Sequence, residues 1–198
     1  MDALFAETYN SGILATLEQN YGQFREYHLE LEITTGEMLR TMNKVTTTKP
    51  RRGEVVMVVP DQEGAIWLHT KEFYPAGVYR LMTGGLAAGE APSEALKREV
   101  EEETGFEVGI DRCLAVITYQ LSGPNRTIPF VSYLFFTTPG IGQPQPTDPD
   151  EAISDFRKVK PDELENVAQN LRSLNGEFKD WGIFRAVAHT VAAAELLK

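Results

Sequence analysis

The sequence predicts an α+β fold in which helices cover a mixed β-sheet. Short apolar runs recur along the 198 residues, and Gly, Pro or polar turn residues bound them, as expected of strands. Segments with helical patterning stand before, between and after these runs, which is the order of elements expected when helices pack on a sheet. Hydrophobic residues make up 42% of the chain, so a full core is possible.

The beginning of the chain is predicted to form an N-terminal α/β extension. Residues 2–22 are compatible with helices, residues 24–33 alternate in the manner of a strand, and a short helix follows. The polar segment 46–54, TTTKPRRGE, contains a proline and a basic cluster, so we place a junction there. We therefore divide the chain into an extension at residues 1–50 and a domain at residues 51–198.

The larger region is predicted to contain most of the strands. Residues 55–59 form a continuous apolar strand of the buried type, and the turn PDQEG leads to a second strand at residues 65–70, as in a hairpin. Two longer strands flank the turn GPNR, at residues 113–122 and 129–138. A short strand and two helices complete the domain, at residues 153–160, 161–171 and 179–197.

Charge and composition exclude several classes of function. The formal net charge of −10 argues against binding nucleic acid through a broadly basic surface. The single cysteine, Cys113, excludes an internal disulfide framework and a metal site built from several cysteines. The apolar stretch at residues 181–197 is interrupted by Arg185 and His189, so we expect no membrane span. Because the N-terminus lacks a secretory pattern, we expect a cytoplasmic protein.

A run of acidic residues in KREVEEETG, residues 97–105, needs an explanation. Pro92 suits the first turn of a helix and Gly105 suits a left-handed cap at its end, so the run lies on a helix. At about 100° per residue, Glu101 points away from the apolar positions of this helix. Three glutamates instead share one sector close to those apolar positions: Glu99, Glu102 and Glu103.

Like charges that share a helical face repel each other unless protons or cations compensate them. A solvated acidic face is the ordinary explanation. A magnesium site is the other explanation, because Mg²⁺ prefers carboxylate and phosphate oxygens. Upstream, LMTGGLAAGE at residues 81–90 has three glycines that permit close approach of the backbone to a ligand. This loop ends at Glu90, within reach of the acidic face if the loop folds back.

The order of these residues resembles the signature of the Nudix hydrolases. Gly84 is followed after five residues by Glu90, and after seven more by REVEEETGF at residues 98–106. Every fixed position of the pattern is filled, with Val100 and Phe106 at its apolar places. The chain is similar to this family over residues 53–198.

The resemblance implies an α/β/α sandwich and hydrolysis of a nucleoside diphosphate linked to another group, X. It implies Mg²⁺ or Mn²⁺ as the cofactor, held by the carboxylates of Glu99, Glu102 and Glu103. Glu90 matches a further acid of the metal shell, and Arg98 matches an arginine that orients a motif glutamate. The resemblance implies a small nucleoside diphosphate derivative as the binding partner. Neither a nucleic acid nor a membrane is expected as a partner.

The expected chemistry suits these residue types. Metal ions neutralise a diphosphate and lower the pKa of a bound water, and a carboxylate then removes the water's proton. Which carboxylate acts as the base varies in the family. In the acidic loop at residues 147–156 we favour Glu151, which stands before the late strand; a solvated acidic loop is the alternative. The expected catalytic residues are Glu99, Glu102, Glu103, Arg98 and Glu151.

Substrate contacts are expected in and just before the glycine-rich loop. Arg80 could donate to a phosphate, and Tyr74 could stack on a nucleobase. Gly84 and Gly85 allow close approach of the backbone. Lys71 is a further cation before the loop. Surface solubility for the cations and packing for the aromatic side chain are the alternatives.

The extension favours ADP-ribose or another nucleoside diphosphate sugar as the substrate, because similar extensions often build the interface of dimeric nucleotide-sugar hydrolases. We accordingly expect a homodimer with residues 1–50 at its interface. Two other functions stay open. One is a house-cleaning hydrolase of modified (d)NTPs, and the other is a module that senses a nucleotide without cleaving it. Sensing relatives often lose motif glutamates, whereas this chain has all of them.

Overall fold

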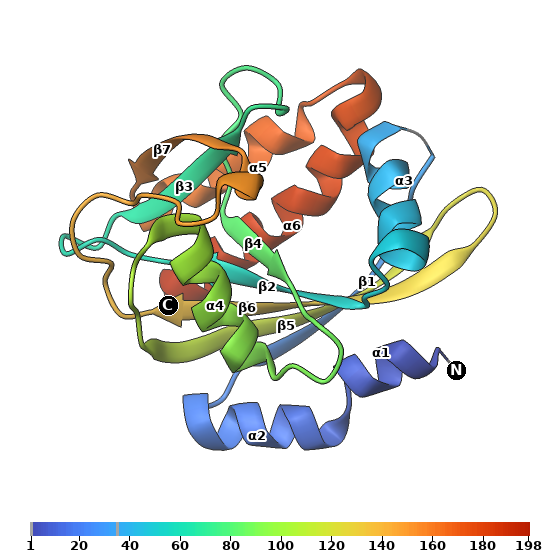
Figure 1. The fold of residues 1–198 in the computed structure, drawn as a ribbon, viewed down its shortest axis with the longest axis horizontal. Coiled ribbons are helices and arrows are strands. Elements are labelled where there is room, and N and C mark those ends of the chain that lie inside the picture. The colour runs from blue at the N-terminus through green and yellow to red at the C-terminus, as the bar shows by residue number, and fades with distance from the viewer. Residues whose placement is uncertain (1, 35) are drawn as a thin grey trace.

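The computed structural model describes residues 2–34 and 36–198, and a five-stranded sheet lies at the centre of this part of the chain (Figure 1). Its strands lie in the order β1-β5-β6-β2-β4. Their bounds are Arg25–Glu32 for β1, Ile110–Ser122 for β5, Thr127–Thr137 for β6, Gly53–Val58 for β2 and Met82–Gly85 for β4. The β1–β5 and β6–β2 pairs are parallel and the β5–β6 and β2–β4 pairs are antiparallel, which confirms the predicted mixed sheet.

A second sheet pairs β3 (Ile66–Lys71) with β7 (Ile153–Val159) in antiparallel fashion. The predicted hairpin of residues 55–59 with 65–70 is therefore wrong for most of its length. Only the end next to the turn forms, where the Trp67 amide donates to the Val59 carbonyl at 2.9 Å. Strand β2 is already paired on both edges, with β6 and β4, so β3 has no free edge of β2 to join and pairs with β7 instead.

Strand β2 shows how the sheet separates two cores. Val55 and Met57 point into one core, and Val56 and Val58 point into the other, because successive side chains of a strand face opposite sides. Helices α2 (Ser11–Tyr21) and α4 (Pro92–Thr104) cover the first side. The second side is covered by α3 (Gly36–Asn43), α5 (Leu164–Arg172) and α6 (Lys179–Leu196). Figure 1 shows α2 and the α5–α6 pair on opposite sides of the sheet, which confirms the α/β/α sandwich.

The N-terminal residues are part of these layers. After the short helix α1 (Ala3–Thr8), β1 pairs along its whole length with β5 and so adds an edge strand to the sheet. The buried Met38 and Met42 of α3 lie in the core that α6 covers. A π-helical turn, η1 (Lys44–Thr48), leads from α3 back toward β2. In the described part of the chain, no helix combines the length and apolarity needed to cross a bilayer.

Candidate functional site

Helix α4 presents its acidic residues as the sequence predicts. It starts at Pro92 and is closed by Gly105, whose φ of 68° is a left-handed conformation that glycine adopts without strain. Glu101 is exposed, whereas Glu99 and Glu103 are only 7% and 0% exposed. Glu102 lies between these extremes. The packing of Leu96 and Val100 into the core turns the acidic sector toward β3 and β4 rather than into bulk water.

Arg98 joins the glutamates of this face to the preceding loop. Its Nε and Nη2 donate to the two carboxylate oxygens of Glu90 at 2.8 and 3.0 Å. Its Nη1 donates to Glu99 at 2.8 Å and to Glu102 at 3.0 Å, and Nη2 also reaches the Gly85 carbonyl at 3.1 Å. The hydrogen bonds from Arg98 hold the pKa of Glu90 below its usual value. Glu90 is thus connected to the acidic face, as its place in the folded-back loop predicts.

Gly84 provides the space that the Glu99 side chain occupies. A Cβ atom at position 84 would lie 1.9 Å from Cδ of Glu99, far inside van der Waals contact. Burial raises the pKa of Glu99, and the neighbouring carboxylates of Glu102 and Glu151 add to this effect against the influence of Arg98. Glu99 is therefore a carboxylate that is confined, largely desolvated and close to other negative charges.

Glu103 is the most buried acid of the site. Both of its carboxylate oxygens are inaccessible to solvent and lack a hydrogen-bond partner. Nζ of Lys71 lies 3.2 Å from Oε1, at ion-pair distance but outside hydrogen-bond geometry, and Nδ1 of His69 lies 3.6 Å from Oε2. Burial raises the pKa of Glu103 to about 8, although Lys71 opposes this shift. Lys71 therefore compensates the charge of this carboxylate only in part.

Glu151 approaches this acid from a different segment. It ends a 3₁₀ turn, η2 (Pro149–Glu151), and contacts Nζ of Lys71, which thereby lies between Glu151 and Glu103. The turn is fixed to α4 because the amide of Thr147 donates to the Glu102 carbonyl at 2.9 Å. Ala152 follows with a φ of 50°, an uncommon conformation for a residue with a Cβ atom. The sequence offers Lys71 as a cation before the glycine-rich loop, with surface solubility as the alternative, and does not indicate its place between two carboxylates.

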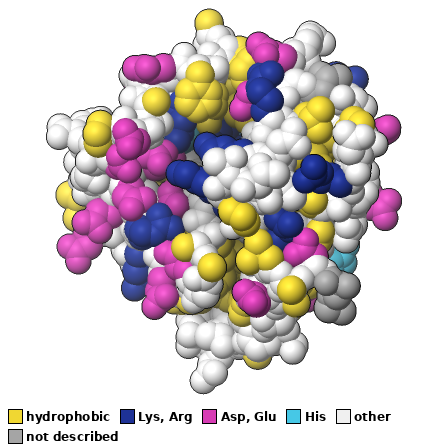
Figure 2. Space-filling view, turned by 45° about the vertical axis from the view of Figure 1, so that its right-hand side comes forward, with side chains coloured by type: hydrophobic (Ala, Val, Ile, Leu, Met, Phe, Trp, Pro, Cys, Tyr) yellow, Lys and Arg dark blue, Asp and Glu magenta, His cyan; other side chains and the backbone are white. Residues whose placement is uncertain are grey.

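A cleft of about 580 Å³ connects these acids to a basic and aromatic region. Figure 2 shows a hollow near the centre of one face, with basic side chains around it and acidic side chains to its left. The predicted substrate contacts Arg80, Tyr74, Gly84 and Gly85 all line the cleft, together with Glu99 and Glu151. Phe73 stands at the cleft with 58% of its surface exposed. The sequence reading missed the lining residues Lys44, Arg51, Trp181 and Arg185.

Arg80 forms part of the buried floor of the cleft. It is 3% exposed, and its Nε donates to the Tyr74 hydroxyl at 2.9 Å while Nη1 donates to the Leu81 carbonyl at 2.7 Å. The guanidinium lies 5.2 Å from the centre of the Tyr74 ring, and the Trp181 ring is 4.9 Å from that of Tyr74. Arg80 and Tyr74 are therefore fixed in position. Arg80 is not a surface cation, because it is buried, and Tyr74 both packs against its neighbours and lines the cleft.

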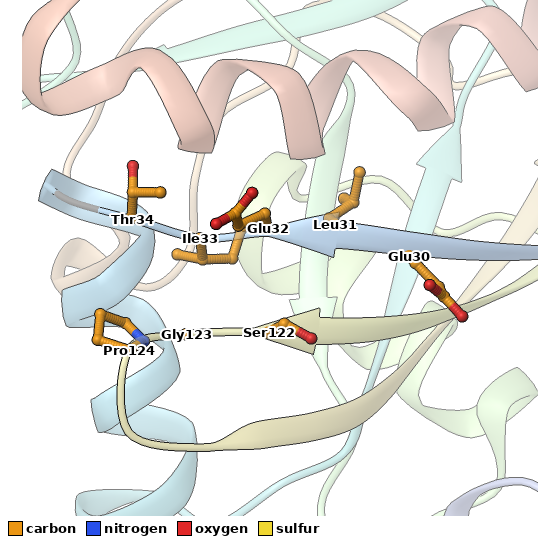
Figure 3. A pocket seen from close by; sticks show the side chains of 8 residues that line it. All are labelled: Glu30, Leu31, Glu32, Ile33, Thr34, Ser122, Gly123 and Pro124. Atoms are coloured by element: carbon orange, nitrogen blue, oxygen red, sulfur yellow. The ribbon is translucent and has the colours of Figure 1, made fainter.

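A different hollow, of about 660 Å³, lies at the end of β1 and is shown in Figure 3. Its lining residues are Glu30, Leu31, Glu32, Ile33, Thr34, Ser122, Gly123 and Pro124. The two glutamates are not balanced by any cation among these residues, so the hollow suits a diphosphate poorly. The cleft beside α4 is the better candidate.

The residues of the cleft fit a divalent cation in their chemistry. In the described residues, no group of three or more His, Cys, Asp or Glu side chains already has the arrangement of a metal cage. Glu99, Glu102 and Glu103 nevertheless supply the hard oxygen donors that Mg²⁺ and Mn²⁺ prefer. The unpartnered oxygens of Glu103 are the specific observation in favour, because a buried carboxylate without a donor needs a proton or a cation.

A family model and several solved structures match the chain. The family model described as NUDIX domain matches residues 49–182. Solved structures with similar folds include a UDP-X diphosphatase, with 22% identity over 64% of this chain and a TM-score of 0.44. The matched region spans 60% of that diphosphatase chain. An Ap4A hydrolase from C. elegans shares 15% identity over 74% of this chain and 98% of its own, with a TM-score of 0.49. No curated protein matches the chain.

Proposed function

The chain belongs to the Nudix hydrolase family, and on this premise we propose that it cleaves the diphosphate bond of a nucleoside diphosphate linked to a group X. The family accounts for the reaction class, hydrolysis of an acid anhydride. The observation that carries the proposal is a single cleft in which the desolvated carboxylate of Glu99 lies together with Arg80 and Lys71. A diphosphate needs both kinds of group, cations for its charge and carboxylates for the metal ions that accompany it.

ADP-ribose or another nucleoside diphosphate sugar is the proposed substrate. The cleft volume of about 580 Å³ suits a molecule of that size. The exposed ring of Phe73 and the fixed ring of Tyr74 offer aromatic surface on which a nucleobase can stack. Tyr79 is absent from this lining, and its hydroxyl donates to Asp155.

Mg²⁺ or Mn²⁺ would be held by carboxylates of Glu99, Glu102 and Glu103, with Glu90 acting through Arg98. When bound, the metal would supply neutralisation of the phosphate oxygens and a lower pKa for the attacking water. Arg98 then has a positioning role, because it fixes two of these glutamates through Nη1. Gly84 also has a positioning role, since only a residue without a side chain leaves room for Glu99.

Glu151 is the proposed general base. It lines the cleft, whereas Glu103 is fully buried, so Glu151 can reach a water in front of a bound diphosphate. Although burial opposes the shift, the hydrogen bond from Lys71 lowers the pKa of Glu151, which keeps it ionised and able to accept a proton. The water oxygen attacks one phosphorus atom and the bridging P–O bond breaks. The products are a nucleoside monophosphate and X-phosphate.

The test is a panel of nucleotides incubated with the protein and Mg²⁺. We expect ADP-ribose or a nucleoside diphosphate sugar to give a nucleoside monophosphate and a sugar phosphate. Faster release of pyrophosphate from dNTPs would replace the substrate assignment with the house-cleaning function. Tight binding of a nucleotide without release of monophosphate or pyrophosphate would contradict hydrolysis itself and indicate a sensing module.

A further inference from the structure

Three arginines line the candidate cleft: Arg51, Arg80 and Arg185. Arg185 is paired with Glu54, whose Oε2 lies 2.8 Å from Nη1. Among the ion pairs of the described residues, none joins a carboxylate to Arg51 or to Arg80. Arg80 is buried and donates only to neutral oxygens, so its positive charge has no counter-charge in hydrogen-bond contact.

Arg51 lies beside β4, the strand that ends in Gly84 and Gly85. A backbone hydrogen bond of Arg51 and the absence of a side chain at Gly85 place it there. Its amide donates to the Val45 carbonyl at 3.1 Å, which fixes the chain where the extension joins β2. A Cβ atom on Gly85 would lie 2.1 Å from Nη1 of Arg51. The guanidinium therefore lies directly on the Gly85 backbone, next to the residue that makes room for Glu99.

Two of the three guanidinium groups, those of Arg51 and Arg185, are only partly satisfied by the protein, whereas Nε, Nη1 and Nη2 of Arg80 all donate within it. Nε of Arg51 and Nε of Arg185 are both inaccessible to solvent and lack a hydrogen-bond partner. The two side chains line a small cavity together with Glu54, so they are close neighbours. Arg80 is connected to Arg185 through His189, whose Nε2 accepts from the amide of Leu81 at 2.8 Å and whose Nδ1 lies 2.9 Å from the Arg185 carbonyl.

We propose that Arg51, Arg80 and Arg185 form a subsite that binds one phosphate group of the substrate. This inference rests on the proposed function and assigns the two phosphates of the diphosphate to different places. One would lie at the glutamates of α4, where a cation is needed, and the other against the arginines, where an anion is needed. Guanidinium groups suit the second task, because their planar donors match phosphate oxygens in pairs.

The subsite lies beside the junction between the N-terminal extension and the domain that starts at residue 51. Arg51 lies shortly after the end of η1, and Lys44 of η1 and Thr41 of α3 line the cleft with it. These residues lie outside the family signature at residues 84–106. The carboxylate of Glu37 also faces the cleft, but Arg40 pairs with it at 2.8 Å and limits its repulsion of an anion.

Binding of inorganic pyrophosphate, measured by titration calorimetry in buffer with EDTA, tests the subsite without the metal and without turnover. We expect the wild-type protein to bind, and Arg51→Gln to bind at least tenfold more weakly. Arg51→Lys keeps the charge but loses the paired donors, so its affinity should fall between the two. Arg126→Gln is the matched control, because Arg126 is exposed and outside the cleft lining; it should bind as the wild type does.

Equal affinity of the wild type and Arg51→Gln would overturn the subsite, as would a wild-type protein that hydrolyses nucleotides but does not bind pyrophosphate. Circular dichroism confirms that each variant is folded. If Arg51→Gln does not fold, Arg51→Lys decides, and wild-type affinity in that variant overturns the proposal. Failure of the proposed function looks different: pyrophosphate would bind through Arg51 while no nucleotide is hydrolysed.

Discussion

Substitution of Gly84 by alanine tests whether the position of Glu99 controls the reaction. The new Cβ atom would lie 1.9 Å from Cδ and 2.3 Å from Oε2 of Glu99. Carbon atoms in contact are about 3.5 to 4.0 Å apart, so the carboxylate must move by more than about 1 Å. A misplacement of about 1 Å can cost a factor of about 10² in rate, or about 2.7 kcal/mol of barrier. We therefore expect kcat/KM to fall about 100-fold.

The assay measures hydrolysis of the best substrate of the nucleotide panel, alongside the Tm of each variant. Overpacking should lower stability by only about 1–3 kcal/mol, so the protein should stay folded. Gly123→Ala is the control, because its Cβ atom would meet neighbours no closer than 3.4 Å and its backbone is unstrained. The reasoning is refuted if Gly84→Ala hydrolyses the substrate at the rate of Gly123→Ala.

Three further predictions follow from the same contacts. Arg98→Ala removes the donor shared by three glutamates and should lower the free energy of unfolding by about 1–3 kcal/mol, with loss of activity. Urea unfolding measures this change, and an unchanged midpoint urea concentration would contradict the prediction. Glu103→Gln replaces a fully buried carboxyl group, whose pKa burial raises to about 8, by a neutral group of similar shape, while Lys71 keeps Glu151 as a partner. Its Tm should not fall, whereas kcat at saturating Mg²⁺ should fall by about 10²-fold or more; wild-type kcat would show that Glu103 has no role in the reaction. Burial lowers the pKa of His189 to about 3 from an ordinary 6.5, so the unfolded chain binds more protons between these values and stability should decrease as pH falls through this range, by at most about 1.4 kcal/mol per pH unit. Urea unfolding across that range should give a shallower pH dependence for His189→Gln, and an identical slope would contradict this cause.

The elements that depend on local signals were predictable from the sequence. The β5–β6 hairpin forms around the GPNR turn, and α4 begins at Pro92 and is closed by Gly105, because turn and cap residues act on their immediate neighbours. The partner of β3 was not predictable, since it depends on which edges of β2 other strands have already taken.

In the candidate site, too, local features were predictable from the sequence and contacts between distant segments were not. The helical period alone places Glu99 and Glu103 on a buried face, and the structure confirms this. The environments of Lys71 and Arg51 depend on segments distant in sequence, namely η2 and β4, so a reading of neighbouring residues gives only surface cations. The homodimer with residues 1–50 at its interface stays a prediction.

An anomalous difference map from a crystal with Mn²⁺ and a non-hydrolysable ADP-ribose analogue tests most directly whether α4 binds the cation that holds the diphosphate. The account predicts a peak among the carboxylates of Glu99, Glu102 and Glu103, with the diphosphate beside it. A map with the analogue in the cleft and no peak among these three side chains would contradict it.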